Sequence, residues 1–513
     1  MPKELPAVPN LEHLKKQAKS LLSDFRGGNP EAVESFRLQG LPRATEEAKL
    51  ADAQRVIARE YGFANWSLLK AHIDAITLEK GDPQGQFKRA VRQGDASRVA
   101  KLIERHPVLR KSINSPILGF DSPPILIAAQ SGNRELLDVL LRFGANINAR
   151  SQWWAGGFGV LDSADSELAA FLIGRGAAVD VHAAAHLGML PRLKELIEGN
   201  RELVNARGGD GKTPLHCAAS VEVAAYLLDQ GADIDARDID HESTAAQYLL
   251  PDHPDVVRFL IQRGCATDIL MAAALGDQSL AQKCLERDPD SIRMRVSDEY
   301  FPMVRPKSGG TIYQWHLGWY VSAHQVAKKF GHGAMFDWLM ARTPDDEKLL
   351  VACWLHDKAL VEELLSRNPN LAAQLRPAAK RHVAHAARTN DLEALKLMLA
   401  AGLPVNERSQ HGGTALHWAA YHGNVGMIRE ILRHSPSLEA VDSDFNGTPL
   451  GWAAHASKEA DEERADVFVE VVGMLLDAGA KPPAKPEGAA ALIEEFRRRG
   501  VPPPEELWIE SES

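Results

Sequence analysis

Cysteine is scarce in this chain. Its 513 residues include four cysteines, Cys217, Cys265, Cys284 and Cys353, and none of them form the closely spaced Cys-x-x-Cys pairs that bind zinc. They are scattered through mostly apolar, helical stretches, so we expect reduced thiols in the core rather than disulfides. The sequence therefore predicts a protein of a reducing compartment, the cytoplasm, without a structural zinc site.

Long apolar runs and an excess of basic residues are also missing. No stretch approaches the roughly 20 apolar residues that cross a bilayer, and the first residues lack the apolar core of a signal peptide. The formal net charge is -10, whereas nucleic-acid binding calls for clustered Lys and Arg. We therefore expect neither a membrane nor a nucleic acid among the partners.

What the sequence does contain is a repeated motif. The residues Thr-Pro-Leu-His-Cys-Ala-Ala at 213–219 return as Thr-Ala-Leu-His-Trp-Ala-Ala at 414–420 and as Thr-Pro-Leu-Gly-Trp-Ala-Ala at 448–454. A glycine after a leucine-rich stretch recurs at Gly231 and Gly264, which are 33 positions apart. A period of this length indicates stacked repeats in which each unit contacts only its neighbours.

In these motifs the chain resembles the ankyrin repeat family, with about twelve degenerate units. Thr213 is placed to cap an inner helix, Pro214 suits its first turn, and His216 is placed to link the backbones of neighbouring fingers. The resemblance implies an all-α solenoid of helix pairs, with short β-hairpin or loop fingers between the pairs.

Parts of the chain fall outside the repeat pattern. The N-terminal segment reads as short helices without the motif, and we interpret it as a cap over the apolar end of the stack. A segment rich in aromatic residues interrupts the repeats, and we expect it to be ordered and to lean on the concave face. The predicted organisation is a helical module at 1–80, repeats at 84–291, an inserted loop at 292–320, repeats at 321–482, and a C-terminal helix and tail at 483–513.

The resemblance also implies where a partner binds, since finger tips and the exposed side of the inner helices form the recognition surface of an ankyrin stack. The tip positions hold Phe120, Trp153, Lys212, His411 and Phe445. The inner-helix positions hold Arg92, Gln130, His186, Trp354, Arg388, Tyr421, His422 and His455. Trp154 beside the second tip, and Trp315 and Trp319 in the inserted loop, complete the candidates. Aromatic, His and Arg side chains dominate, as they do at binding hot spots.

The histidines allow a second hypothesis. His182 and His186 lie four apart on one predicted helix, a spacing that suits a metal, but no third ligand is apparent and we predict no metal site. Counted in the same register, Asp162, His182 and His216 fall in a row that could act as an acid/base cluster. The competing interpretation, which we favour, is that these side chains satisfy backbone groups of the fingers.

Two functions remain in view. The leading hypothesis is a scaffold that recognises a protein or peptide non-covalently along its concave groove, without a cofactor. The alternative is an enzyme or small-molecule binder with a pocket under the 292–320 loop, lined by Trp153, Trp315 and the four candidate catalytic residues Asp162, His182, His186 and His216. The sequence leaves the partner's identity and the oligomeric state open.

Overall fold

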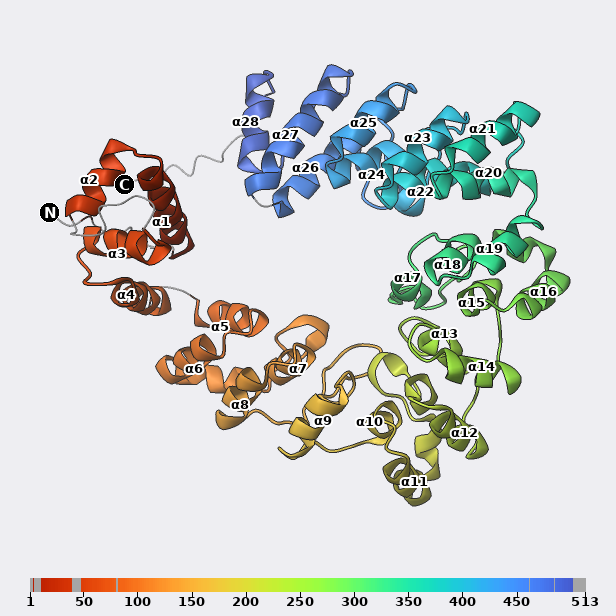
Figure 1. Cartoon of the computed structure of the whole chain (residues 1–513), viewed down its shortest axis with the longest axis horizontal. Helices are drawn as coiled ribbons and strands as arrows, with labels where there is room; N and C mark the ends of the chain where they lie inside the picture. The colour runs from red at the N-terminus through yellow and green to blue at the C-terminus, as the bar shows by residue number, and fades with distance from the viewer. Residues whose placement is uncertain are drawn as a thin grey trace, which may run out of the picture. The chain divides into compact units, whose positions relative to one another are not determined.

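The computed structural model describes residues 3, 11–38, 48–79, 82–460, 462–483 and 485–501. The chain divides into two compact units, Met1–Asp233 and Ile234–Ser513, which are described in turn (Figure 1). Within the described residues the regular structure is helical, because strand pairing is limited to isolated bridges such as that between Arg237 and Thr244. The predicted all-α class is confirmed. Among the described helices, none has both the length and the apolarity needed to cross a membrane.

The first unit opens with a helical module that has its own core. The rings of Phe25 and Phe36 stack in this core with their centroids 4.0 Å apart. Asn10 and Thr45, residues of the types that cap helices, are the caps that the sequence predicts in this module, and they lie outside the described residues. The helices of the module are α1 (Leu11–Arg26), α2 (Pro30–Leu38), α3 (Leu50–Glu60) and α4 (Trp66–Glu79).

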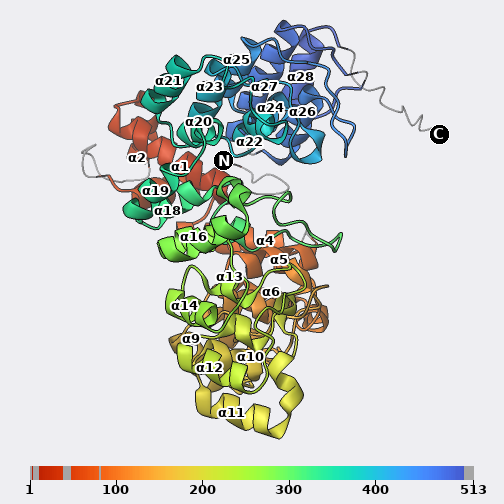
Figure 2. The same ribbon diagram turned by 90° about the vertical axis from the view of Figure 1, so that its right-hand side faces the viewer.

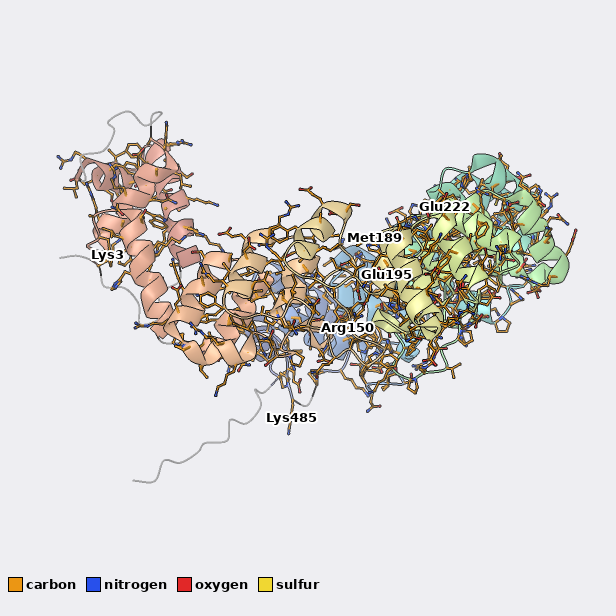
Figure 3. All side chains as sticks on the ribbon, turned by 90° about the horizontal axis from the view of Figure 1, so that it is seen from below. Lys3, Arg150, Met189, Glu195, Glu222 and Lys485 are labelled. Carbon is orange, nitrogen blue, oxygen red and sulfur yellow. The ribbon has the colours of Figure 1, made fainter. Side chains whose placement is uncertain are left out.

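Helix pairs follow the module in the first unit. Each pair consists of an inner helix with small buried residues and an outer helix that shows charged side chains to solvent, such as Glu195 and Glu222 (Figure 3). The helices are α5 (Pro83–Arg92), α6 (Ala96–Arg105), α7 (Pro124–Gln130), α8 (Arg134–Arg142), α9 (Ser166–Ile173), α10 (Val181–His186), α11 (Leu190–Gly199) and α12 (Val221–Asp229).

Asx caps fix the turn between the two helices of a pair. The Oδ1 atom of Asn133 accepts from the backbone N–H of Leu136 over 2.9 Å, which starts α8. The side-chain amide of the same residue donates to the carbonyl of Gly94 over 2.8 Å, in the turn of the preceding pair. One residue therefore begins an outer helix and links it to the neighbouring repeat.

Two repeats depart from the helix-pair pattern. The Thr-Pro-Leu-His motif at 213–216 starts only a short 3₁₀ helix, Pro214–Cys217, before the chain enters α12. Residues 151–165 form turns and irregular backbone, with no helix preceding α9. The first of these places carries the full motif and still forms no full inner helix, whereas the second lacks the motif.

The second unit continues the pairs. Figures 1 and 2 show α22, α24 and α26 side by side as a row of inner helices, in agreement with their mutual contacts. The helices of the unit are α13 (Ala245–Leu249), α14 (Pro254–Gln262), α15 (Ile269–Leu275), α16 (Gln278–Arg287), α17 (Tyr313–His316), α18 (Ala323–Lys329), α19 (Gly333–Met340), α20 (Asp345–Trp354), α21 (Lys358–Arg367), α22 (His382–Arg388), α23 (Leu392–Ala400), α24 (Ala415–His422), α25 (Val425–Leu432), α26 (Pro449–Glu459), α27 (Glu462–Asp477) and α28 (Ala490–Arg498).

The Thr-x-x-His motif links one repeat to the next. At the start of α24, the backbone N–H of Thr414 donates to Nδ1 of His417 over 3.1 Å. The opposite ring nitrogen, Nε2, lies 3.1 Å from the carbonyl of Gly447 in the next finger and donates to it. Because Nδ1 accepts, the ring proton is on Nε2, and burial lowers the pKa of His417, which favours this neutral form.

The inserted segment leaves and rejoins the stack at one place. At its base the N–H of Val296 donates to the carbonyl of Val321 over 3.1 Å, and the N–H of Tyr320 donates to the carbonyl of Val296 over 2.8 Å. Its outer part is held by the Glu242 carboxylate, which accepts from the backbone N–H groups of residues 304 and 305 over 3.0 and 2.8 Å. The inner helices of the repeats before and after the segment, α15 and α18, pack directly against each other.

Candidate functional site

The inner helices of the second unit repeat two positions beside their buried Ala-Ala pairs, the first largely buried and the second more exposed. The residue before each buried Ala-Ala pair is His385, Trp418 or Trp452 in α22, α24 and α26. The residue after the pair is Arg388, Tyr421 or His455. Because the three helices lie side by side, each position forms a line of side chains across the repeats.

Two tryptophans, each only 8% exposed, form a largely buried layer beneath this face, which we call its floor. The indoles of Trp418 and Trp452 meet edge to face, with centroids 5.0 Å apart. Nε1 of Trp418 donates to Oγ of Ser409 over 2.8 Å, and Nε1 of Trp452 donates to Oδ2 of Asp442 over 2.8 Å. Each indole is therefore held by a hydrogen bond to the finger that precedes its own helix.

Asp442 organises the finger next to this floor. Its carboxylate also accepts from the backbone N–H groups of Asp444, Phe445 and Gly447 over 2.9, 2.6 and 2.8 Å. Burial raises the pKa of Asp442, but these hydrogen bonds and the one from Trp452 outweigh burial and lower the pKa to about 2. The charged carboxylate thus fixes both the finger and the indole.

Two more exposed aromatic side chains, Phe445 and Tyr421, lie next to these indoles. The side chain of Phe445 is 70% exposed and that of Tyr421 is 39% exposed, and their centroids lie 6.4 and 6.0 Å from that of Trp452. His411 at the neighbouring finger tip lies 5.6 Å from the Phe445 ring, and its Nδ1 is 2.7 Å from a carboxylate oxygen of Asp444.

Arg388 extends the face toward the insertion. Its guanidinium carbon lies 3.9 Å from the ring centroid of Trp319 and 5.5 Å from that of Trp418, so the cation lies between two indoles. Burial lowers the pKa of Arg388 to about 10. Nε2 of His422, whose ring stacks with Trp418, donates to the backbone carbonyl of Arg388 over 2.8 Å.

We call this set the aromatic surface. It consists of Trp319, Arg388, His411, Trp418, Tyr421, His422, Phe445 and Trp452. Beside it, a pocket of about 220 Å³ opens between Tyr421, His422 and the start of α27, where Arg464 and Phe468 form its wall. The structure thus brings together predicted binding residues from separate repeats and from the insertion.

A smaller group of predicted residues meets in the first unit. The ring of Phe120 lies 5.0 Å from that of Trp153 and 6.2 Å from that of Phe158. Trp154 lies 6.3 Å from Trp153, and the ammonium of Lys212 lies 5.9 Å from the Phe158 ring. We call these five residues the finger cluster. Phe120 is 54% exposed, so the cluster offers an apolar surface of its own.

Other predicted binding residues lie outside both groups. Trp354 is only 7% exposed, since it packs in the core and its Nε1 donates to Nδ1 of His382 over 2.9 Å. It offers a partner almost no surface, which corrects the sequence-based expectation for this residue. Trp315 is 72% exposed on α17. Exposed side chains are also found at Arg92, Gln130 and His455.

The candidate catalytic histidines are engaged with backbone carbonyls. Nε2 of His182 lies 3.0 Å from the carbonyls of Ala206 and Lys212, at the base of the next finger. Nε2 of His186 donates to the carbonyl of Ala164 over 3.1 Å. These are hydrogen bonds of the kind that the backbone-linking interpretation predicts.

His216 and Asp162 are likewise engaged with neighbouring groups. Nδ1 of His216 accepts from the backbone N–H of Thr213 over 3.1 Å. Oδ2 of Asp162 accepts from the N–H of Gly159 over 3.0 Å and lies 3.6 Å from the Arg150 guanidinium. Burial nevertheless raises the pKa of Asp162.

Comparison with known families agrees with this architecture. Family models described as Ankyrin repeats (3 copies) match residues 160–238, 181–271 and 382–485, and a model described as Ankyrin repeat matches residues 122–152. The chain is an ankyrin repeat protein. Ankyrin repeats are in general protein-interaction scaffolds, and this coarse role applies to the chain.

Individual relatives share the repeats over part of their length. The Ankyrin repeat domain-containing protein SAT10 of Stachybotrys chartarum is 25% identical over 386 residues, which cover 68% of this chain and 18% of that protein. The E3 ubiquitin-protein ligase KEG of Arabidopsis thaliana is 25% identical over 249 residues, or 45% of this chain and 15% of the ligase. The L-asparaginase of Dirofilaria immitis is 30% identical over 145 residues, or 27% of this chain and 24% of the asparaginase. The chain thus matches less than a quarter of each relative's length.

The ankyrin motif itself concealed two residues of the site. Trp418 and Trp452 occupy the position that Cys217 holds in the copy at 213–219, and from the sequence they were interpreted only as repeat positions. The signal was present, because two of the three copies carry an indole at a position where a small side chain also fits. Asp442 gave no comparable signal, since its role depends on the fold of one finger.

The insertion covers a cavity within the second unit. The cavity has a volume of about 310 Å³, and its walls include Glu242, Thr244 and Asp268 from the repeats and Phe301 and Met303 from the insertion. Its lining does not include the candidate catalytic residues. Oδ2 of Asp268 accepts from the hydroxyl of Tyr313 over 3.1 Å, and burial raises the pKa of Asp268.

Proposed function

We propose that the aromatic surface binds a partner protein non-covalently, through an extended segment that lies across α22, α24 and α26. The observation that carries the proposal is the exposure of Phe445 and Tyr421 above the indoles of Trp418 and Trp452. Exposed apolar clusters with fixed rings are typical of protein interaction sites. We place the segment along the row of inner helices, next to the fingers, because the exposed rings lie there.

The energetics favour aromatic anchors at this position. Burial of apolar surface contributes about 25 cal/mol per Å², and truncation of an aromatic hot-spot residue typically costs about 2 kcal/mol or more of binding free energy. The hydrogen bonds from Trp418 and Trp452 to their fingers order the floor before the partner arrives. An ordered floor reduces the entropy that is lost on association.

The finger cluster supports the same role for the first unit. Trp153 contacts Phe120, and its Nε1 is buried without a hydrogen-bond partner among the described residues. We assign Trp153 and Phe120 as a further anchor for a protein partner, to be tested independently of the aromatic surface.

Peptide selection on the full-length chain tests the proposal. A display library of random linear peptides is selected, and the affinity of the selected peptides is measured for the wild type and for Phe445→Ala, Tyr421→Ala and Trp153→Ala. We expect each variant to bind a set of these peptides about 10-fold or more weakly, with an unchanged helical circular dichroism spectrum. Val108→Ala, at a 65% exposed position outside both groups, is the control.

Two results of this experiment would contradict the proposal. If no peptide is selected, or if every selected peptide binds the Phe445→Ala and Tyr421→Ala variants as tightly as the wild type, the aromatic surface is not the binding site. The variant Trp315→Ala then reports whether the exposed side of the insertion binds instead.

The cavity under the insertion favours a second candidate, a small-molecule ligand. A volume of about 310 Å³ falls in the range of small-molecule sites, and the walls combine apolar rings with polar groups. A thermal-shift screen of metabolite-sized compounds tests it, with Met303→Trp as the variant that fills the cavity. A ligand of this site raises the melting temperature of the wild type and not of the variant.

A further inference from the structure

Arg388 differs from the other partly buried arginines of the second unit. Arg293 donates to Asp346 over 2.7 Å, and Arg295 donates to Glu347 over 2.7 Å. Arg388 has no ion pair with any described carboxylate, and Asp298 acts on it only as a nearby charge. Buried cations are as a rule paired, so this guanidinium lacks the partner that its neighbours have.

Two hydrogen-bond donors are unsatisfied at the same place. Nη1 of Arg388 and Nε1 of Trp319 are both buried, and neither has an acceptor among the described residues. The indole nitrogens of Trp418 and Trp452, by contrast, each have one. A buried donor without an acceptor is unfavourable, and more so when it is charged. A molecule that supplies an acceptor here removes this unfavourable contribution when it binds.

The unpaired donors lie on the route of the proposed segment. Arg388 takes the position after the Ala-Ala pair that Tyr421 takes one repeat later, and its guanidinium lies beside the Trp418 indole of the floor. A chain that covers Tyr421 and continues by one repeat therefore reaches Arg388. The guanidinium carbon lies near the rings of two indoles. An acceptor therefore approaches the guanidinium at its N–H edge rather than over its flat face.

We propose that the segment bound by the aromatic surface is acidic, and that one of its Asp or Glu carboxylates accepts hydrogen bonds from Arg388 and Trp319. This inference rests on the proposed function. A carboxylate is favoured over a neutral acceptor because it matches both the charge and the fork of the guanidinium. Since Arg388 is half-buried rather than enclosed, a rotamer change of the kind common at interfaces opens the acceptor position.

The test uses the full-length chain and the peptides selected on it. Each acidic residue of a selected peptide is replaced in turn by its amide, and affinities are measured for the wild type and for Arg388→Gln, Arg388→Lys and Trp319→Phe. We expect one Asp-to-Asn or Glu-to-Gln change to weaken binding to the wild type by about 10- to 100-fold. The same change has little further effect on binding to Arg388→Gln, because the cation it pairs with is already absent.

The controls separate this pairing from general charge attraction and from damage to the fold. Arg429→Gln removes an arginine from the outer helix α25, where the side chain is 60% exposed, and is expected to bind the peptides as the wild type does. Arg388→Lys keeps the charge but loses the fork and the stacking, so intermediate affinity is expected. Thermal melts of all variants accompany the binding data, and the peptide substitutions themselves leave the protein unchanged.

The outcomes distinguish the two proposals. If peptides depend on Tyr421 and Phe445 but not on any carboxylate, or bind Arg388→Gln as tightly as the wild type, the acidic partner is excluded and the proposed function stands. If peptides are indifferent to Tyr421 and Phe445 as well, both proposals fail.

Discussion

Trp452 and Asp442 are joined by a hydrogen bond of 2.8 Å from the indole Nε1 to the carboxylate Oδ2. The first residue lies on the inner helix α26 and the second lies in the finger that precedes this helix. The same carboxylate accepts the backbone N–H of Phe445, the most exposed ring of the aromatic surface. The floor and the exposed tip of the aromatic surface are therefore held by one side chain.

Replacement of Asp442 by Asn tests this arrangement. The amide retains one acceptor oxygen and presents an NH₂ group where the second oxygen accepted, so we expect the free energy of unfolding to fall by about 1–3 kcal/mol. Urea denaturation followed by circular dichroism measures the change. Asp444→Asn, at a neighbouring side chain that is 47% exposed, is expected to stay within about 0.5 kcal/mol of the wild type. Equal stability of the two variants contradicts the role assigned to Asp442.

His417 provides a second test, of the link between repeats. His417→Ala removes both the acceptor for Thr414 N–H and the donor to the Gly447 carbonyl. We expect a loss of about 1–3 kcal/mol in the free energy of unfolding, since both groups are left in a buried place. His434→Ala, at the end of α25, where the 34% exposed imidazole lies 3.5 Å from Glu430, is the matched control. A smaller loss at His417 than at His434 would count against the link.

The buried ion pair at the base of the insertion gives a third prediction. The side chains of Arg295 and Glu347 are 2% and 4% exposed and lie 2.7 Å apart. Glu347→Gln leaves the arginine without its counter-charge, so we expect a destabilisation of about 3–5 kcal/mol. The control is Glu363→Gln, because Glu363 is 62% exposed and only 3.4 Å from another exposed side chain, Arg367. Melting temperatures that fall equally for the two variants disprove the prediction.

Buried histidines make the second unit sensitive to acid. Burial lowers the pKa of His324 and of His385 to about 3, and it lowers the pKa of His382 well below the usual value. The unfolded chain binds these protons near pH 6.5, whereas the folded chain does not, so their contribution is present above about pH 6.5 and is lost as the pH falls. Each such group lowers stability by about 1.4 kcal/mol per pH unit below that value.

This pH dependence is measured by urea titrations between about pH 7 and pH 5. We expect the unfolding midpoint to fall steadily over that range. The variant His385→Phe, which keeps a ring for Tyr320 to stack on, should show a shallower fall. A midpoint that does not change between these pH values contradicts the burial of neutral imidazoles.

The class of the fold could be predicted from the sequence because the residues of the repeat motif make the same hydrogen bonds in each full copy. Thr414 and His417 occupy fixed places in each full copy, and their hydrogen bonds follow from those places. The length of the helix was harder to predict: Thr213 and His216 carry the full motif, yet the helix that they begin is a short 3₁₀ helix. Helix length depends on the residues that follow the motif and on packing against neighbouring repeats, which a motif does not encode.

The candidate site was predicted in part. Tyr421, Phe445 and Arg388 were found from repeat register, which places side chains on a face but does not say which of them are exposed. Trp354 shows the limit of that reasoning, because it has the register of a surface residue and lies in the core. The pairing of Arg388 with Trp319 joins the insertion to α22, and register within the repeats contains no information about such a contact.

Backbone hydrogen bonds at the base of the insertion allow its length to vary. Val296 exchanges backbone hydrogen bonds with residues 320 and 321, and α15 packs directly on α18. The residues between Val296 and Tyr320 therefore form an insertion whose two ends are joined at its base. Its length can therefore change during evolution while the contact between α15 and α18 is kept, so new surface can be added at this point.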